Sequence, residues 1–410
     1  MPVRRGRRTG GAEEIALAVE LVDELVDGTK SAALPLIRHD LALSYWQIGL
    51  LASVPLVAGS LLELPIPILA GAGPWRRRTV LGGGAVFIAA LLAVAAARSF
   101  GGLLIAFVVF FPASGAFVSL TQAALMDADP GRLAQHMARW NLAGSAGSVA
   151  GPLLLAVLLA CGGGWRAAYL VLAAGAAVAW LGAARTGRRP AADKAIPRAA
   201  EPAAPPAADR PAGASRLDRL RQAAAALRRA DVLRWVVLLQ IADLLLDVLT
   251  GFLALYFVDV VHATPAQAAI AVAVRLAAGL AGNTVLVGVL ERVGGRSLLR
   301  ASAVAAALLY PGFLLVPGLV PKLVVLAALS AATAPWYPVL QSELYRSLPG
   351  RSGVAVSLTS AAGLVGGLGP LAVGLVAQRA GLLWAMGCLT VVPLALWISI
   401  SSSDFLPHRG

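Results

Sequence analysis

A stripe of charged residues interrupts the first apolar segment of the chain, in the stretch Glu20-Leu21-Val22-Asp23-Glu24-Leu25-Val26-Asp27-Gly28-Thr29-Lys30. The surrounding apolar segment, residues 15–37, is long enough to cross the roughly 30 Å hydrocarbon core of a bilayer as a helix. Positions 20, 23, 24, 27 and 30 are three or four residues apart, so a helix places them on one face. A charge at bilayer depth costs on the order of 3 kcal/mol. This face must therefore point to protein or water.

The composition indicates a membrane protein that crosses the bilayer many times. The 410 residues are 59% hydrophobic and only 13% charged, which leaves too little polar surface for a soluble domain. Apolar runs separated by Gly, Pro and charged residues predict an all-α protein with twelve transmembrane helices in two pseudo-symmetric six-helix bundles. The predicted spans are residues 13–37, 45–70, 79–97, 101–126, 135–160, 166–184, 232–257, 265–290, 297–317, 321–344, 353–377 and 380–401.

A polar stretch between the two sets of spans divides the chain. Residues 185–230 are rich in Ala, Pro and Arg and end in a segment with leucines among arginines. This pattern predicts a cytoplasmic linker followed by an amphipathic helix on the membrane surface. The predicted units are therefore an N-terminal bundle over 1–184, the linker over 185–230, and a C-terminal bundle over 231–410.

The two bundles are related by an internal repeat. A shift of 220 positions lays Asp23 and Asp27 over Asp243 and Asp247. Parallel six-helix halves imply a central site between them and alternating access by rocking. Most Lys and Arg residues fall in loops that alternate onto one side, and the positive-inside rule then places both termini in the cytoplasm. Because these basic residues lie between apolar runs, we expect no nucleic-acid binding.

The loop after the eighth predicted span carries the most specific motif. It reads GVLERVGGR over residues 288–296 and resembles G-x-x-x-D/E-R-x-G-R/K-R/K, the cytoplasmic gate motif of the major facilitator superfamily, with one residue fewer between Gly288 and Glu291 and with Gly295 at one of the late basic positions. The chain resembles a member of that superfamily over nearly its whole length. The first-half loop keeps only the basic end of the motif. The resemblance assigns gate roles to Gly288, Glu291, Arg292, Gly294, Arg296, Arg76 and Arg77.

The fifth predicted span also resembles a superfamily motif. Its sequence GSAGSVAGP, residues 144–152, is similar to the glycine-rich fifth helix of exporters. Close helix contact at Gly144, Gly147 and Gly151, with a bend at Pro152, is its physical content. The first span is similar to bacterial drug exporters of the fosmidomycin-resistance type. These resemblances imply a proton-coupled exporter of a small organic or drug-like molecule, in the inner or plasma membrane of a bacterium.

The charged stripe supplies the predicted coupling residues. Two carboxylates one helical turn apart disfavour shared ionisation, so Asp23 and Asp27 can hold and release a proton. Asp243 and Asp247 repeat the pair in the second half. In the alternative interpretation, Lys30 only neutralises Asp27 in a structural pair. Arg275 is predicted at the depth of Asp247, where the two could form a structural salt bridge or a switch that exchanges partners.

The predicted substrate contacts come from several spans. They are Glu24, Lys30, Asn141, Arg275, Trp336 and Tyr337. In this superfamily the first, fourth, seventh and tenth helices line the cavity. Trp336 and Tyr337 are therefore expected to stack on substrate, or alternatively to pack between helices. A competing hypothesis is a proton-coupled uptake symporter for a small anionic metabolite, with Lys30 and Arg275 as carboxylate ligands.

Other classes of function are disfavoured. No nucleophile and base motif and no histidine cluster is present, so we do not expect an enzyme. No phosphate-binding loop of an ATP-driven pump occurs. Cys161 and Cys388 are isolated, and neither a metal site nor a cofactor is predicted. The expected partners are a small-molecule substrate, protons and the lipid bilayer, and we expect a monomer.

Overall fold

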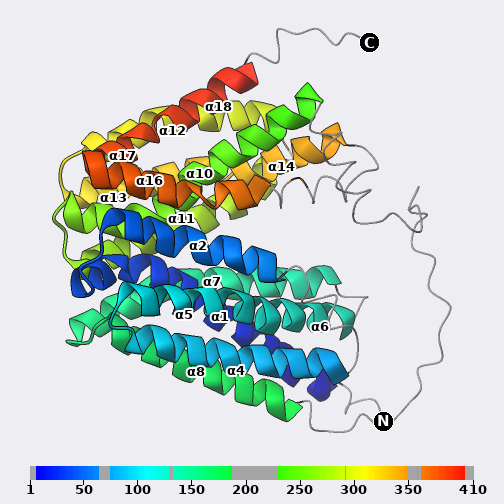
Figure 1. Cartoon of the computed structure of the whole chain (residues 1–410). Helices are drawn as coiled ribbons and strands as arrows, with labels where there is room; N and C mark the ends of the chain where they lie inside the picture. Colours follow the sequence, from blue (N-terminus) through cyan, green and yellow to red (C-terminus); the bar gives the residue numbers. More distant parts are fainter. Residues whose placement is uncertain are drawn as a thin grey trace.

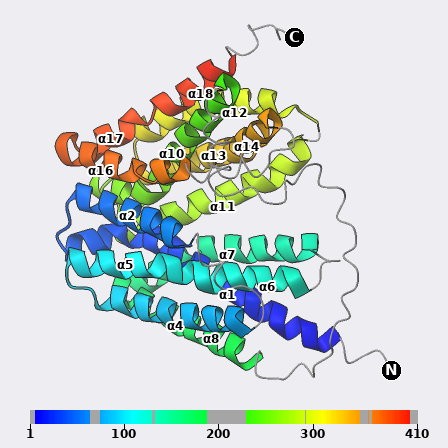
Figure 2. The same cartoon turned by 45° about the vertical axis from the view of Figure 1, so that its right-hand side comes forward.

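The computed structural model describes residues 6–63, 74–128, 133–186, 229–290, 292–348, 358 and 362–401. All regular structure in these ranges is helical. The helices of residues 6–186, here called the first half, lie together on one side, and those of residues 229–401, the second half, lie on the other (Figures 1 and 2). The predicted linker with its surface helix, and Glu291 of the gate motif, fall outside the described residues.

The helices follow the predicted spans closely. The first half contains α1 (Gly6–Asp40), α2 (Tyr45–Glu63), α4 (Pro74–Ala96), α5 (Phe100–Ser114), the π-helical turn η1 (Gly115–Ser119), α6 (Leu120–Ala128), α7 (Leu133–Ala160) and α8 (Trp165–Thr186). The second half contains α10 (Ala230–Asp259), α11 (Pro265–Leu290), α12 (Gly295–Leu315), α13 (Leu319–Thr333), α14 (Trp336–Ser347), α16 (Gly369–Ala380), α17 (Leu382–Cys388) and α18 (Val391–Ser401).

Ten helical segments in the described part of the chain are long and apolar enough to cross a membrane. Some combine consecutive elements: α5, η1 and α6 form the segment Phe100–Asp127, and α13 with α14 forms Leu319–Ser347. The helices α1 and α2 are not among the ten. α1 contains the charged stripe, and the apolar part of α2, Tyr45–Gly59, is shorter. The count of twelve therefore stays a prediction that requires α1 and α2 to cross as well.

Glycines of α7 bring it into close contact with α1. A methyl group at Gly147 would collide with the backbone of α1 at Leu21 and Leu25, and one at Gly151 would lie 2.7 Å from the amide nitrogen of Thr29. In addition, Thr29 Oγ1 donates a hydrogen bond of 3.1 Å to the carbonyl of Gly151. The small residues thus let two backbones approach within reach of side-chain hydrogen bonds, which fixes the rotation of the charged stripe.

The two halves pack closely against each other where α1 ends and α2 begins. We call this the α1–α2 end, defined by residues 38–45. Here α2 crosses α16 so closely that a methyl group at Gly49 would lie 2.8 Å from the carbonyl oxygen of Pro370. Towards the opposite end, the ribbons of α7 and α11 diverge (Figure 2).

Candidate functional site

The acidic residues of the charged stripe in α1 all have partners within the first half. Ser114, the last residue of α5 before the π-helical turn, donates a hydrogen bond of 2.7 Å to Asp23. Ser148 of α7 donates one of 2.5 Å to Glu24. Glu20 bonds to the side chain of Trp140. Asp27 forms an ion pair of 2.6 Å with Lys30. Two other helices, α5 and α7, therefore hold this face of α1, together with Lys30 of α1 itself.

The ion pair between Asp27 and Lys30 is open to solvent on one side. The Asp27 side chain is 58% exposed, although it belongs to the middle of α1. The ammonium of Lys30 lies 4.9 Å from the ring centre of Phe111, so an aromatic face covers its other side. The pairing of Lys30 with Asp27, expected if Lys30 only neutralises that carboxylate, is thus present. Its exposed side faces the second half, because both residues lie within electrostatic range of Asp247.

The two aspartates of α10 differ from their first-half counterparts. Neither Asp243 nor Asp247 has a hydrogen-bond or ion-pair partner among the described residues. The two lie one helical turn apart and act electrostatically on each other. Asp247 is exposed. The repeat in sequence therefore does not extend to the contacts. Asp23 and Asp27 have hydrogen-bond or ion-pair partners, whereas Asp243 and Asp247 have none among the described residues.

The structure corrects the predicted salt bridge between Asp247 and Arg275. Arg275 is buried on α11, and its Nη2 donates a hydrogen bond of 2.5 Å to the backbone carbonyl of Leu246. Asp247 is within electrostatic range, but the two side chains form no ion pair. Arg275 thus binds the backbone carbonyl of the residue before Asp247 instead of the carboxylate. The spacing of the sequence places both acceptors at the same depth and could not distinguish them.

Of the two predicted aromatic contacts, only Tyr337 is accessible. Trp336 is 0% exposed, and its indole nitrogen donates a hydrogen bond of 3.0 Å to Ser302 of α12. The expectation that Trp336 stacks on substrate is therefore wrong for this conformation, and the alternative of packing between helices describes it. Tyr337 is 45% exposed and lies in electrostatic range of Asp243. Asn141 of α7 is also exposed.

A polar latch joins the halves at the α1–α2 end. Arg38 of α1 forms an ion pair of 2.8 Å with Asp259, the last residue of α10. The hydroxyl of Tyr45 donates a hydrogen bond of 2.8 Å to the same carboxylate, and the Arg38 guanidinium lies 4.2 Å from the centre of the Tyr45 ring. The backbone nitrogen of Tyr45 donates to Gln378 of α16 at 3.0 Å. The polar latch thus connects α1 and α2 with α10 and α16.

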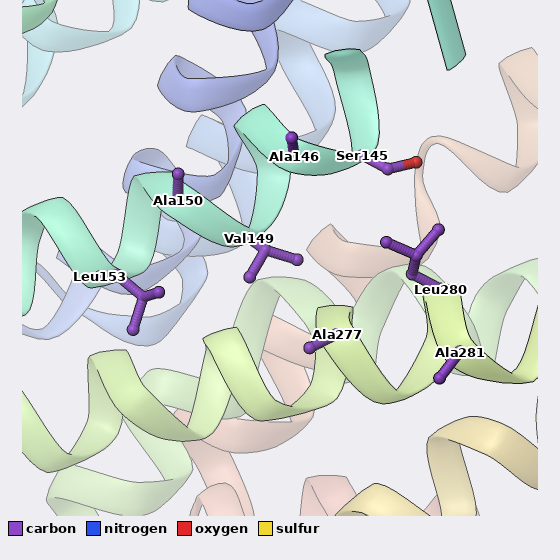
Figure 3. A pocket seen from close by; sticks show the side chains of 8 residues that line it. All are labelled: Ser145, Ala146, Val149, Ala150, Leu153, Ala277, Leu280 and Ala281. Carbon is purple, nitrogen blue, oxygen red and sulfur yellow. The ribbon is translucent and has the colours of Figure 1, made fainter. Parts of the chain in front are cut away.

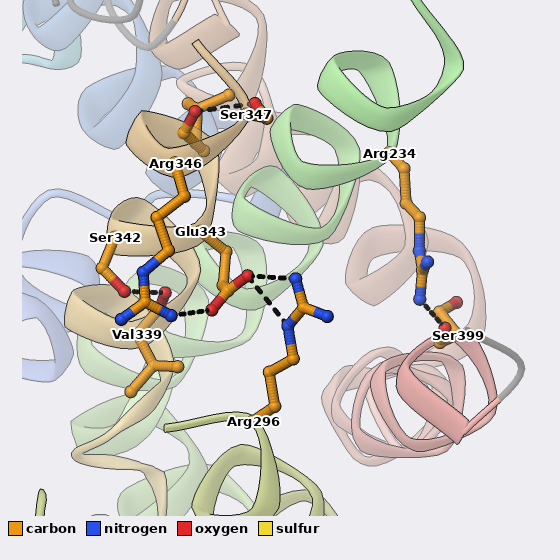
Figure 4. A network of polar contacts seen from close by, with 9 residues as sticks. Arg234, Arg296, Val339, Ser342, Glu343, Arg346, Ser347 and Ser399 are labelled. Carbon is orange, nitrogen blue, oxygen red and sulfur yellow. Dashed lines mark hydrogen bonds and ion pairs between the residues drawn. The ribbon is translucent and has the colours of Figure 1, made fainter. Parts of the chain in front are cut away.

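At the opposite end, the gate-motif arginines bind acids within their own halves. Arg296 donates two hydrogen bonds to Glu343 of α14, at 2.9 and 2.6 Å, and Arg346 donates a third at 2.6 Å (Figure 4). Glu343 is only 1% exposed. In the first half, Arg76 forms an ion pair of 2.7 Å with Asp127 of α6. The basic end of the degraded first-half motif therefore still connects the start of α4 with α6.

The remaining gate-motif positions show fewer contacts. Arg77 donates a hydrogen bond of 3.0 Å to the carbonyl of Ala184 in α8. Arg292 is exposed, and no neighbouring atom lies within 4 Å of a methyl group placed at Gly288 or Gly294.

A groove of about 390 Å³ runs along the seam between α7 and α11. Figure 3 shows its lining, which is made of small and branched apolar side chains except for the hydroxyl of Ser145. Val149 and Leu153 of α7 face Ala277 and Leu280 of α11 across it. The groove lies between the two halves, on the side of α7 away from the glycine contact with α1.

Several site residues were not predicted from the sequence. Ser114 belongs to no motif, and Ser148 lies in the glycine-rich stretch 144–152 without an assigned role; only the fold brings the two hydroxyls to the charged stripe. Arg38 had a weak signal, as one of the few basic residues in the loops predicted to lie outside the cell. Among the described residues, no group of three or more His, Cys, Asp or Glu side chains could hold a metal ion.

Membrane-length apolar helices in two halves, with charges from both halves in electrostatic range of each other, are the arrangement found in membrane transporters. The family comparison agrees: the Major Facilitator Superfamily matches residues 21–370, and the chain belongs to this family. It is accordingly a multi-pass membrane protein. Comparison with curated protein sequences finds no match.

Solved structures share the fold at low sequence identity. A bacterial homolog of the human lysosomal transporter Spinster, in an inward-facing and unoccupied conformation, is 16% identical with a TM-score of 0.76, and 98% of each chain is covered. The nucleoside transporter NupG is 12% identical with a TM-score of 0.74, covering 98% of this chain and 100% of that one. The POT family transporter PepTSo is 14% identical with a TM-score of 0.69, covering 97% and 99%. At these identities the likeness shows the fold alone.

Proposed function

We propose that the chain is a secondary active transporter of twelve transmembrane helices that exports a small organic or drug-like molecule in exchange for protons. The observation that carries this proposal is the facing of Asp27 and Lys30 with Asp247 across the seam between the halves. Carboxylates from both halves in one interior provide groups whose protonation changes the attraction between those halves. Coupling of proton and substrate movement requires such a dependence.

The charged stripe and the α10 aspartates have different parts in this mechanism. Asp27 is held by Lys30, so protonation of Asp27 would release a cation beside the seam. Asp243 and Asp247 have no partner among the described residues and stand open for a proton or a substrate group. Asp23 and Glu24 accept hydrogen bonds from hydroxyl groups, contacts that either protonation state can keep. We therefore place proton exchange first at Asp27 and Asp247.

The substrate would lie between α1, α10 and α14. Tyr337 offers an exposed aromatic face beside Asp243, and Asn141 offers an amide from α7. We expect the polar latch to close the outer side, because the positive-inside rule assigns residues 38–45 to it. The structure would then be inward-facing, with both termini in the cytoplasm of a bacterium and the protein in its inner or plasma membrane.

The competing uptake symporter for an anionic metabolite is less well supported by the contacts. It requires Lys30 and Arg275 as carboxylate ligands, yet Arg275 is buried on the carbonyl of Leu246 and Lys30 is bound to Asp27. Only release of both would leave them free to bind an anion.

Transport by purified protein tests the proposal. A thermal-shift screen against metabolites and drugs identifies a ligand, since a molecule that binds the folded state raises the melting temperature. In proteoliposomes, an exporter that exchanges protons accumulates this ligand when the lumen is acid, whereas a symporter does so when the outside is acid. Asp27→Asn and Asp247→Asn should abolish the pH-driven part and leave the fold intact.

Asp231→Asn is the matched control. It makes the same chemical change on α10, but Asp231 lies at the start of that helix, paired with Arg229 at 2.7 Å. Transport that keeps its full pH dependence in Asp27→Asn and Asp247→Asn would refute proton coupling at these residues. Accumulation with the outside acid would favour the symporter.

A further inference from the structure

Two arginines lie beside one tryptophan at the end of the second half where α10 begins, and a third is linked to them through a shared carboxylate. The guanidinium of Arg234 lies 5.2 Å from the ring centre of Trp235, and that of Arg296 lies 5.5 Å from the same centre. Arg346 joins them through Glu343, which it shares with Arg296 (Figure 4). We call Arg234, Trp235, Arg296, Glu343 and Arg346 the arginine cluster. Its members come from α10, α12 and α14.

The charges of this cluster do not balance. Glu343 accepts from both Arg296 and Arg346, and it is the only acid in ion-pair contact with any of the three arginines within the described residues. Arg234 donates instead to the backbone carbonyl of Ser399 in α18. The three arginines therefore have one buried carboxylate among them, which only two of them contact, and the excess charge is turned outward, because Arg346 is 72% and Arg296 50% exposed.

The level of the cluster in the membrane limits what can supply the missing negative charge. Arg234 lies one turn into α10, a helix that spans from Ala230 to Asp259, and Arg296 lies at the start of α12. Arginine and tryptophan near the ends of spanning helices lie at the headgroup layer, where lipid phosphates are the most abundant anions. Guanidinium groups bind phosphate oxygens in a fork geometry, which favours Arg over Lys for this purpose.

We propose that the arginine cluster binds the headgroup of an anionic phospholipid. The phosphate would be held by Arg234 and Arg296 over the edge of Trp235, and Arg346 would add charge from the exposed side. A bound phosphate would also compete with Glu343 for Arg296, so this lipid acts on the gate loop between α11 and α12. The proposal does not depend on the transported substrate or on proton coupling.

Lipid retention by detergent-solubilised protein tests the proposal. Native mass spectrometry would measure binding of phosphatidylglycerol, with phosphatidylcholine as the zwitterionic comparison. The wild-type protein should prefer phosphatidylglycerol, and Arg234→Gln should weaken that binding about fivefold, as expected for one arginine near a charged headgroup. Arg229→Gln is the matched control. It removes an equal charge from a position five residues before Arg234, and the side chain of Arg229 is already paired with Asp231.

Four results would overturn the proposal. They are equal binding of the two lipids, equal loss in Arg234→Gln and Arg229→Gln, binding that does not weaken with added salt, and displacement of the lipid by inorganic phosphate at matched ionic strength. The last result would indicate a site for a free anion. If Arg234→Gln melts at a much lower temperature, Arg346→Gln takes its place, because that side chain is the most exposed of the three.

Discussion

Arg38 of α1 and Asp259 of α10 form an ion pair of 2.8 Å that joins the two halves of the transporter. Both side chains are less than a third exposed, and Tyr45 donates to the same carboxylate. Because this contact exists only while the α1–α2 end is closed, its strength enters the conformational equilibrium directly. A half-buried pair of this kind contributes about 1 kcal/mol, which is roughly a fivefold change in the ratio of the two conformations.

Reversal of the charge at Arg38 is therefore expected to open the α1–α2 end. Arg38→Asp alone should increase the reactivity of a cysteine placed at Gln378 towards a thiol reagent that cannot cross the membrane. The double variant Arg38→Asp with Asp259→Arg should restore protection, because the attraction is rebuilt with opposite polarity. A double variant as reactive as the single one would show that the pair does not hold this end closed.

A larger residue at Gly49 of α2 should also open the α1–α2 end, in this case for a steric reason. A methyl group there would lie 2.8 Å from the Cα of Leu371 and from the carbonyl of Pro370 in α16. Gly49→Ala should therefore favour the conformation in which α2 and α16 separate, measured by spin-label distances across this end. Gly387→Ala in α17 is the control, because nothing lies within 4 Å of the added methyl group. The same distance distribution in both variants would contradict the prediction.

Gly147 lies within one half and should affect stability instead of the conformational equilibrium. Its added methyl group would meet the backbone of α1 at Leu21 and Leu25. We expect Gly147→Ala to lower the stability by about 1–3 kcal/mol, as for other overpacked interiors. Gly82→Ala in α4, where space is open, should be neutral or slightly stabilising. Melting temperatures of the purified variants check this, and a stabilised Gly147→Ala would disprove the close contact.

Trp336 and Tyr337 are neighbours with opposite expected roles. Trp336→Phe removes the hydrogen bond to Ser302 and should lower the stability by about 1 kcal/mol while the KM for substrate is unchanged. Tyr337→Phe should leave the melting temperature nearly unchanged and alter KM, because its hydroxyl is at the exposed side beside Asp243. A KM effect confined to Trp336→Phe would restore the substrate contact predicted from the sequence.

Asp40 provides a pH-dependent prediction outside the predicted first span. The hydrogen bond from Arg166 holds the pKa of Asp40 below its usual value of 3.8. A lowered pKa means that the contact stabilises the fold above pH ~4 and is lost as the pH falls through the lowered pKa. Asp40→Asn should therefore melt up to about 2 °C below wild type at pH 6, since the pair is partly exposed, and the difference should shrink as the pH falls below about 4. A difference in melting temperature that does not shrink between pH 6 and acid pH would contradict this.

The sequence predicted the helices well because membrane spans are encoded locally, in the length and hydropathy of each run. It also identified Asp23, Asp27, Asp243 and Asp247 as one repeated set, since charge at bilayer depth is costly wherever it occurs. It could not predict which of these acids has a partner. Ser114 and Ser148 are ordinary hydroxyls, and their role depends on how far α5 and α7 are rotated. The same limit explains the error at Trp336, whose neighbour Tyr337 points the other way.

The π-helical turn at Gly115–Ser119 has a consequence for how the two halves are related. The offset between the halves is 220 positions at Arg76 and Arg296 but 219 at Pro130 and Pro349, so the first half contains one additional residue between these points. A π turn accommodates one more residue than an α turn without ending the helix. The added residue is thus absorbed inside a continuous span, as a local widening that places Ser114 against Asp23. The first half has in this way a hydroxyl contact to its aspartate for which the described residues of the second half show no counterpart at Asp243.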